Sequence, residues 1–161
     1  MALELPTAII SPEDLASLEL EVKDYARWFE HNQIKQRVGA KSSSQPPEVS
    51  ASALELIRGC HGKGLLEQKH LDKLIDDLER LKSSATSLTI TLAAPAPKTL
   101  KADIANWCRT NLERQVLIDF RFNSTILGGM VVRAGSHVYD WSWRRAILDN
   151  KAKFPEVLAN V

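Results

Sequence analysis

The chain has 161 residues, of which 44% are hydrophobic and 25% charged, and its formal net charge is +1. This balance is ordinary for a globular protein and argues against bulk nucleic-acid binding, which usually needs a strongly basic face. Two cysteines are too few for a disulfide framework. The longest apolar stretch, residues 126–132, is far too short to span a bilayer, and the first residues resemble neither a secretory signal nor a transit peptide. We therefore expect no direct membrane insertion.

The first predicted element is a helix over about residues 12–37. Ser11 suits the N-cap, Pro12 the first helical position, and Glu13 and Asp14 the positive end of the helix dipole. Apolar residues then recur at steps of three and four, which gives one stripe: Leu15, Leu18, Val22, Tyr25 and Phe29. Because few other helices are predicted nearby, we expect part of this stripe to remain open as a groove for a partner helix.

A loop and two more helices follow. Residues 39–48, with three consecutive serines and Pro46-Pro47, break the helical pattern. A short helix is predicted over residues 50–58, closed by Gly59. A stronger helix then carries an apolar face opposite a charged, ion-paired surface, and that face consists of Leu66, Leu71, Leu74, Ile75, Leu78 and Leu81.

From Thr86 the hydrophobic period changes from helical to two. Residues 86–92 predict a half-buried strand, and Pro95 and Pro97 introduce a helix over about residues 98–113. The expected apolar face of that helix consists of Leu100, Ile104, Trp107, Cys108 and Leu112. A second alternating strand covers residues 116–122, with Asp119 and Arg121 pointing outward.

The last elements are a hairpin and a helix. Met130, Val131 and Val132 favour a strand, residues 134–136 a turn, and residues 138–139 a further strand. Asp140 and Ser142 are alternative N-caps for the final helix. The fold class is therefore α + β, with a reduced helical N-terminal domain over residues 1–84, whose Ser/Pro-rich loop lies near residues 40–50. A C-terminal α/β domain of order β-α-β-β-β-α occupies residues 85–161.

No residue pattern indicates catalysis, a cofactor or a metal. Gly128-Gly129 lacks the spaced glycines and lysine of a phosphate-binding loop, so we expect one glycine to adopt a positive φ or to admit a close backbone. Cys60, His61 and His70 lack a fourth zinc ligand at a standard spacing. We interpret them as a buried thiol and two surface imidazoles.

Four residues near the end of the chain are candidate partner contacts or internal supports. Arg144 and Arg145 fall in the first turn of the last helix, where the dipole disfavours cations. An internal ion pair, with Asp119 or Asp140, or the carboxylates of a partner should compensate, and both can hold, with one arginine each. Trp141 and Trp143 flank Ser142, and we expect one to be in the core and the other to be an exposed anchor at an interface.

The same stretch resembles the C-terminal signature of the delta subunit of rotary ATP synthases, the family that includes the oligomycin sensitivity-conferring protein. The matching positions are Ile126, Leu127, Gly128, Gly129, Arg133, Gly135, Asp140, Ser142, Arg144 and Arg145. The resemblance covers about residues 65–148. Trp141 departs from it, because the family usually has a small residue there. The first half also departs from it, being shorter than the family's six-helix bundle and lacking the tyrosine-alanine pattern that opens its first helix.

The resemblance implies a non-catalytic peripheral-stalk, or stator, subunit of a proton-translocating ATP synthase. In that family, the N-terminal helices bind the N-terminal segments of the α subunits and the C-terminal domain binds the C-terminal ends of the b subunits. The protein would then lie on the cytoplasmic side of the cell membrane, without nucleic acid or cofactor, and resist rotor torque. A different class, a stand-alone α + β protein- or RNA-binding module, would instead show a basic stripe with exposed aromatics on its sheet. An enzyme would need a pocket of titratable residues with shifted pKa values.

Overall fold

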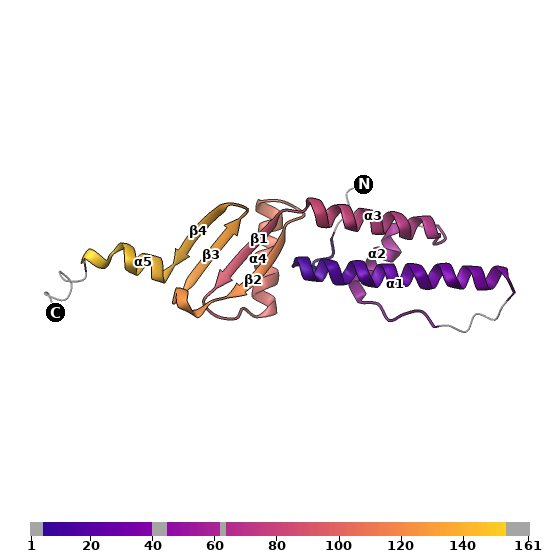
Figure 1. Ribbon diagram of the computed structural model, residues 1–161, viewed down its shortest axis with the longest axis horizontal. Helices are drawn as coiled ribbons and strands as arrows, with labels where there is room; N and C mark the ends of the chain where they lie inside the picture. Colours follow the sequence, from indigo (N-terminus) through magenta and orange to yellow (C-terminus); the bar gives the residue numbers. More distant parts are fainter. Residues whose placement is uncertain (1–4, 40–44, 62–63, 154–161) are drawn as a thin grey trace. The chain divides into compact units, whose positions relative to one another are not determined.

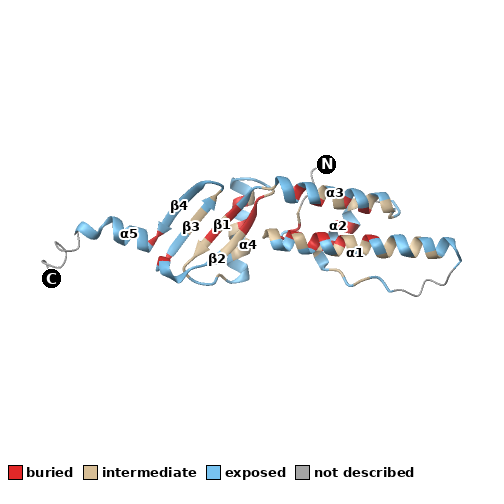
Figure 2. Ribbon diagram, viewed as in Figure 1, coloured by how far each residue is buried: buried red, intermediate tan, exposed pale blue. Residues whose placement is uncertain are grey.

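A computed structural model describes residues 5–39, 45–61 and 64–153 (Figure 1). The chain divides into two compact units, which we call unit 1 (Met1–Ala85) and unit 2 (Thr86–Val161). The division falls where the hydrophobic pattern of the sequence changes from helical to alternating. Each unit buries its own set of apolar residues (Figure 2). No helix within the described ranges is both long enough and apolar enough to cross a membrane.

The described part of unit 1 contains the helices α1 (Pro12–Arg37), α2 (Ala51–Cys60) and α3 (Gln68–Ser84). Helix α1 has the predicted bounds because Ser11 and Asp14 cap it reciprocally. The Ser11 hydroxyl accepts from the Asp14 amide at 3.1 Å, and the Asp14 carboxylate accepts from the Ser11 amide at 2.9 Å. The prediction that Gly59 closes α2 is wrong, since the helix continues through Gly59 to Cys60. Glycine inside a helix costs only about 0.5–1 kcal/mol relative to alanine, which the rest of α2 tolerates.

Helices α1 and α3 lie side by side and bury their apolar stripes against each other and α2 (Figure 1). The predicted faces are largely confirmed, although Leu66 precedes α3 and Tyr25 and Phe29 are only half-buried. The core of unit 1 consists of Ile9, Leu15, Leu18, Val22, Ala26, Ala53, Leu56, Ile57, Leu71, Leu74, Leu78 and Leu81.

An ion-pair network joins α1 to α3 beside this core. Glu19 of α1 is only 7% exposed, and its carboxylate pairs with Lys23 at 2.6 Å and with Lys82 of α3 at 2.8 Å. Lys23 in turn pairs with Glu79 at 2.7 Å. Hydrogen bonds from Lys23 and Lys82 lower the pKa of the Glu19 carboxyl. The two ammonium groups therefore stabilise a carboxylate that burial alone would disfavour.

Unit 2 has the predicted order of strands and helices. The elements are β1 (Ser87–Leu92), α4 (Lys98–Asn111), β2 (Leu117–Phe122), β3 (Gly129–Ala134), β4 (His137–Ser142) and α5 (Trp143–Asp149), with the short 3-10 turns η1 (Ser124–Ile126) and η2 (Lys151–Lys153). The strands form one sheet of order β2-β1-β3-β4. Strand β1 pairs parallel with β2 and antiparallel with β3, which pairs antiparallel with β4. The α + β fold class is thus confirmed.

The apolar face predicted for α4 is correct at Cys108, which is buried, and wrong at its three largest exposed residues. Ala105 and Cys108 are the buried residues of this helix, whereas Leu100, Trp107 and Leu112 are 44%, 60% and 62% exposed. Small side chains at positions 105 and 108 let the helix approach the sheet closely, so the larger residues on its flank turn outward. Helix α4 therefore buries a narrow face and leaves Trp107 on the surface.

Candidate functional site

One face of the sheet in unit 2 is apolar across all four strands, but only part of it is covered. The strand register places Ile118, Phe120, Leu88, Ile90, Val132, Met130, Tyr139 and Trp141 on the same face. Helix α4 lies over the β1 and β2 part of this face, where the Lys101 ammonium is 5.7 Å from the centre of the Phe120 ring. Leu88, Ile90 and Ile118 are accordingly buried.

The part of this face on β3 and β4 is exposed, and we call its residues Met130, Val132, Tyr139 and Trp141 the aromatic half-face. Met130 is 39%, Tyr139 50% and Trp141 59% exposed, and Val132 is half-buried. The rings of Tyr139 and Trp141 stack with centroids 5.8 Å apart and an interplanar angle of 16°. In Figure 2, β4 is coloured as exposed along almost its whole length. Exposed aromatics arranged in this way are typical of interface anchors.

The opposite face of the sheet is mixed where β3 and β4 contribute to it. Arg133 and Asp140 lie there with Val131 and Val138, beside Thr89 and Thr91 of the neighbouring strand. On the same face Asp119 pairs with Arg121 at 2.7 Å. What distinguishes the aromatic half-face is its pair of stacked, exposed aromatic rings, which suits it to a partner.

The glycine pair before β3 fixes how the hairpin meets α5. Gly129 has a φ of +75°, as expected for one of the two glycines, and a β-carbon there would run into the carbonyl oxygen of Trp141. A β-carbon on Gly128 would lie 2.5 Å from the Trp143 ring. The Trp143 amide also donates to the Gly128 carbonyl at 3.0 Å. The two glycines thus allow the end of β4 and the Trp143 indole to lie directly against the chain.

The remaining positions of the predicted signature surround this junction. Ile126 is buried, while Leu127 is 61% exposed with a φ of +65°, which is unusual for a branched side chain. Gly135 has a φ of +57° and forms the hairpin turn with Ser136.

The two alternatives for the N-cap of α5 are resolved in favour of Ser142. Its hydroxyl accepts from the Arg145 amide at 3.2 Å, and the residue is only 3% exposed. Asp140 stabilises the turn just before the helix: its carboxylate accepts from the Ser142 amide at 2.9 Å. Hydrogen bonds from Ser142, and to a smaller extent the nearby Arg145 and Arg144, lower the pKa of the Asp140 carboxyl. Both residues therefore hold the turn from strand to helix.

An internal ion pair, as predicted, exists for one of the two arginines, but its direct partner is neither Asp119 nor Asp140. Arg145 pairs with Asp149 in the same helix at 2.8 Å, and Asp119 is engaged by Arg121. The spacing of four residues on a helix explains the first pair, and the short reach between adjacent positions on one strand face explains the second. Arg144 is exposed and forms no direct ion pair with any described carboxylate, although its charge acts on Asp140 from a longer distance. Of the two cations, Arg144 is the one available to a partner.

The expectation that one tryptophan belongs to the core is also wrong. Trp141 is 59% and Trp143 63% exposed, because the chain changes from strand to helix at Ser142 and neither indole points into the sheet's covered half. Helix α5 buries none of its residues, and Ile147 and Leu148 are 44% and 56% exposed. Sequence reasoning singled out Trp141 but missed Met130, Val132 and Tyr139. The sequence did contain evidence for a shared aromatic face, because residues 139 and 141 are two apart on one strand and must point to the same side.

The described residues contain no group of three His, Cys, Asp or Glu side chains placed to hold a metal ion. The residues weighed as zinc ligands are engaged with backbone instead. The Cys60 thiol donates to the Ile57 carbonyl at 3.0 Å, His61 Nδ1 lies 3.0 Å from the Gly64 carbonyl, and His70 Nδ1 accepts from the Glu67 amide at 3.2 Å. Burial raises the pKa of the Cys60 thiol, which disfavours the thiolate that metal binding needs.

The chain is similar in sequence to one known protein family. The sequence pattern of the family described as ATP synthase delta (OSCP) subunit matches residues 66–153, more than half of the chain. Among solved structures, a chain of the Polytomella F-ATP synthase in a primary rotary state, determined by electron cryo-microscopy, is similar with 12% identity and a TM-score of 0.37. That similarity covers 48% of this chain and 100% of the other. No curated protein matches in sequence. The matched residues span α3 and all of the sheet with its glycine junction, and on that match the chain belongs to the ATP synthase delta (OSCP) family, whose members are non-catalytic stator subunits of the peripheral stalk.

Proposed function

We propose that this protein connects the catalytic head of a rotary ATP synthase to the stalk, with one unit for each side. Unit 1 binds the N-terminal segments of the α subunits, and unit 2 binds the C-terminal ends of the b subunits. In this role the protein keeps the head from turning with the rotor, on the cytoplasmic side of the cell membrane. The separation of the chain into two units, each with its own core, supports such a division of work.

The observation that supports the proposal is the aromatic half-face, which is followed in the chain by an exposed cation. Tyr139 and Trp141 are stacked and half-exposed, and Arg144 follows them on a helix that buries none of its own residues. A partner helix with an apolar stripe and a carboxylate at its end would cover the rings and pair with Arg144. An aromatic residue that acts as an interface hot spot costs about 2 kcal/mol or more of binding free energy when it is replaced by alanine.

The test is binding of the full chain to the purified stalk, with two tryptophan variants of matched exposure. Trp141→Ala should weaken binding about thirtyfold, because it removes an anchor worth roughly 2 kcal/mol. Trp107→Ala is the control, since Trp107 is 60% exposed but belongs to α4 and not to the strands that form the half-face. Equal loss in both variants would refute the proposed surface.

The charge contribution is tested separately. Arg144→Glu should weaken stalk binding and leave the fold intact, whereas Arg145→Glu should also loosen α5, because it breaks the pair with Asp149. A pull-down with the intact protein from a detergent extract should recover the α and b subunits of the synthase. Recovery of nucleic acid in their place would contradict the proposed connection of head and stalk and would support the alternative, a stand-alone RNA-binding module.

A further inference from the structure

The last strand of the sheet in unit 2 has a free edge. Strand β4 pairs with β3 on one side, and no described strand lies on its other side (Figure 1). Natural edge strands usually carry a lysine, a proline or a bulge that blocks pairing with another chain. The six residues of β4 include neither lysine nor proline, and their register with β3 is regular throughout. The edge is therefore open to a further strand.

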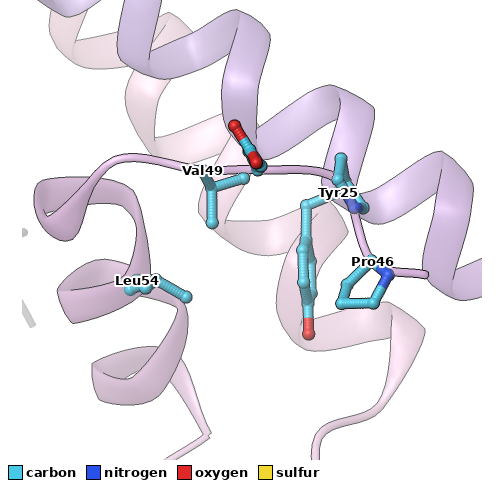
Figure 3. A pocket seen from close by; sticks show the side chains of 6 residues that line it. Tyr25, Pro46, Val49 and Leu54 are labelled. Atoms are coloured by element: carbon cyan, nitrogen blue, oxygen red, sulfur yellow. The ribbon is translucent and has the colours of Figure 1, made fainter.

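Unit 1 has an exposed feature of a different kind, a shallow depression between α1, α2 and the segment that precedes α2 (Figure 3). It is open to solvent and is lined by Tyr25, Pro46, Pro47, Glu48, Val49 and Leu54. Its one charged side chain, that of Glu48, does not specify a partner. The edge of β4 is more specific, because its donors and acceptors are set at fixed spacings along the strand.

The hydrogen bonds within the hairpin show which residues face the free edge. Antiparallel strands alternate between residue pairs that exchange backbone hydrogen bonds and pairs that do not. The two-residue turn makes Ala134 and His137 a hydrogen-bonded pair. At the other end of the hairpin the Trp143 amide donates to the Gly128 carbonyl at 3.0 Å, which fits the same alternation. The even-numbered residues of β4 therefore point their amides and carbonyls outward.

Two of these even-numbered residues, Val138 and Asp140, offer donors and acceptors to a partner. The third, Ser142, has its amide bonded to the Asp140 carboxylate at 2.9 Å. No described residue bonds the outward backbone groups of Val138 or Asp140. Each of these two residues could exchange a pair of backbone hydrogen bonds with an antiparallel strand.

A second copy of β4 fits this edge in one antiparallel register. Hydrogen-bonded pairing would place Asp140 opposite an even-numbered residue of the copy. Asp140 opposite Asp140 would set two carboxylates together, which is destabilising. Ser136 belongs to the hairpin turn, and the Ser142 amide is already bonded. Asp140 opposite Val138 has none of these faults, and a two-fold axis then satisfies the outward groups of both chains alike.

The side chains match in the same register. Tyr139 would lie opposite Tyr139 of the copy at a position without hydrogen bonds, where side chains are closest and aromatic pairs are favourable. On the other face Arg133, the neighbour of Val138 on β3, would share a row with Asp140 of the copy. Two strand spacings, about 10 Å between Cα atoms, separate them, and the two side chains can bridge this distance together. Symmetry forms this contact between opposite charges twice.

We propose that the free protein dimerises through β4, which joins the two sheets into one. The start of α5 leaves the edge clear, because the Trp143 ring lies against Gly128 on the β3 side of the hairpin. The occupant is a second copy because both the hydrogen-bonding groups and the charges of β4 and β3 complement themselves about the axis. Dimerisation concerns the protein before it joins the stalk, and it does not depend on the function proposed above.

The first test is sedimentation equilibrium of the full-length protein over a series of concentrations. Wild type should change from monomer to dimer as the concentration rises. Val138→Pro removes an outward amide from each chain without removing a bond to β3, and it should raise the dissociation constant at least about tenfold. Val138→Thr is the matched control, since it keeps the amide and the branched side chain and should dimerise like wild type.

The charges and the backbone are tested separately. Arg133→Glu should weaken the dimer by about three- to tenfold, because two contacts between opposite charges become repulsive. Arg114→Glu makes the same change of charge in the connection between α4 and β2, and should have no effect. Hydrogen exchange of the Val138 and Asp140 amides should slow as the wild-type concentration rises. Exchange of the Tyr139 amide, which faces β3, should not change.

Three results would overturn the inference. Wild type that stays monomeric at the highest soluble concentration shows that the edges do not pair. A dimer that Val138→Pro leaves intact forms through another surface. Protection of the Val138 and Asp140 amides at every concentration shows that the edge is covered within one chain. If circular dichroism shows that Val138→Pro does not fold, Arg133→Glu and the exchange of the Asp140 amide decide. Stalk binding is measured separately with Trp141→Ala, so either proposal can fail alone.

Discussion

Replacing Gly129 with alanine should destabilise unit 2 far more than the same change at Gly135. Both glycines have positive φ, +75° and +57°. A β-carbon at residue 135 would meet no atom within 4 Å, whereas at residue 129 it would overlap the carbonyl oxygen of Trp141, a backbone atom. The two positions therefore separate the cost of the left-handed conformation from the cost of steric overlap.

The magnitudes follow from these two terms. The left-handed conformation costs an L residue about 1–2 kcal/mol, partly offset by about 0.4–1 kcal/mol because alanine restricts the unfolded chain. Gly135→Ala should thus lower the free energy of unfolding by about 1 kcal/mol. At Gly129 the neighbouring backbone must also move, which adds about 1–3 kcal/mol in a packed region. Gly129→Ala should therefore cost about 2–4 kcal/mol in total.

The assay is urea unfolding, combined with hydrogen exchange of the amides of β1 and β3 so that the loss is assigned to unit 2. Gly129→Ala should increase exchange throughout the sheet, and Gly135→Ala should affect mainly the hairpin turn. Equal destabilisation by the two variants would refute the claim that close approach of Trp141, rather than φ alone, requires glycine at residue 129.

Three other changes have expected outcomes. Glu19→Gln should lower the free energy of unfolding by about 1–2 kcal/mol at pH 7 by breaking the pairs with Lys23 and Lys82. Because the folded pKa of Glu19 is lowered, its stabilisation is complete above about pH 4.5 and is lost as the pH falls further. The difference between wild type and variant in urea unfolding should therefore disappear in acid, and a constant difference would contradict it. Gly59→Ala should raise the free energy of unfolding by about 0.5–1 kcal/mol in thermal melts, since no atom lies within 4 Å of the added carbon. Ser142→Ala should cost about 1 kcal/mol and speed exchange of the Arg145 amide, while unchanged exchange would show that the cap is dispensable.

Features that depend on local sequence were predictable. Helix α1 has its predicted bounds because its cap residues and apolar stripe all lie within the helix itself. The order of elements in unit 2 and the unusual φ of Gly129 followed in the same way from periodicity and from the glycine pair. Each of these predictions needed only residues that are neighbours along the chain.

Features that depend on contacts across the fold were not predictable. The buried face of α4 is set by how closely Ala105 and Cys108 allow it to approach the sheet, and hydrophobicity alone favours Leu100 and Trp107. The pair of Arg145 with Asp149 is different: it spans four residues of one helix, so it was missed although it depends on local sequence alone. The aromatic half-face was missed because its exposure depends on α4 covering only β1 and β2. The sequence does not state the strand order that leaves β3 and β4 uncovered.

The position of β1 in the sheet has a consequence for the nascent chain. This strand is the first of the four to be made but lies in the interior of the sheet, between β2 and β3, so neither of its partners has left the ribosome when it emerges. At typical elongation rates the delay before β3 emerges is roughly a few seconds. During that time Leu88 and Ile90, which are buried in the finished protein, have no sheet to enter. Unit 2 therefore depends on slow, non-local pairing, and we expect its nascent form to need a holding chaperone more than unit 1 does.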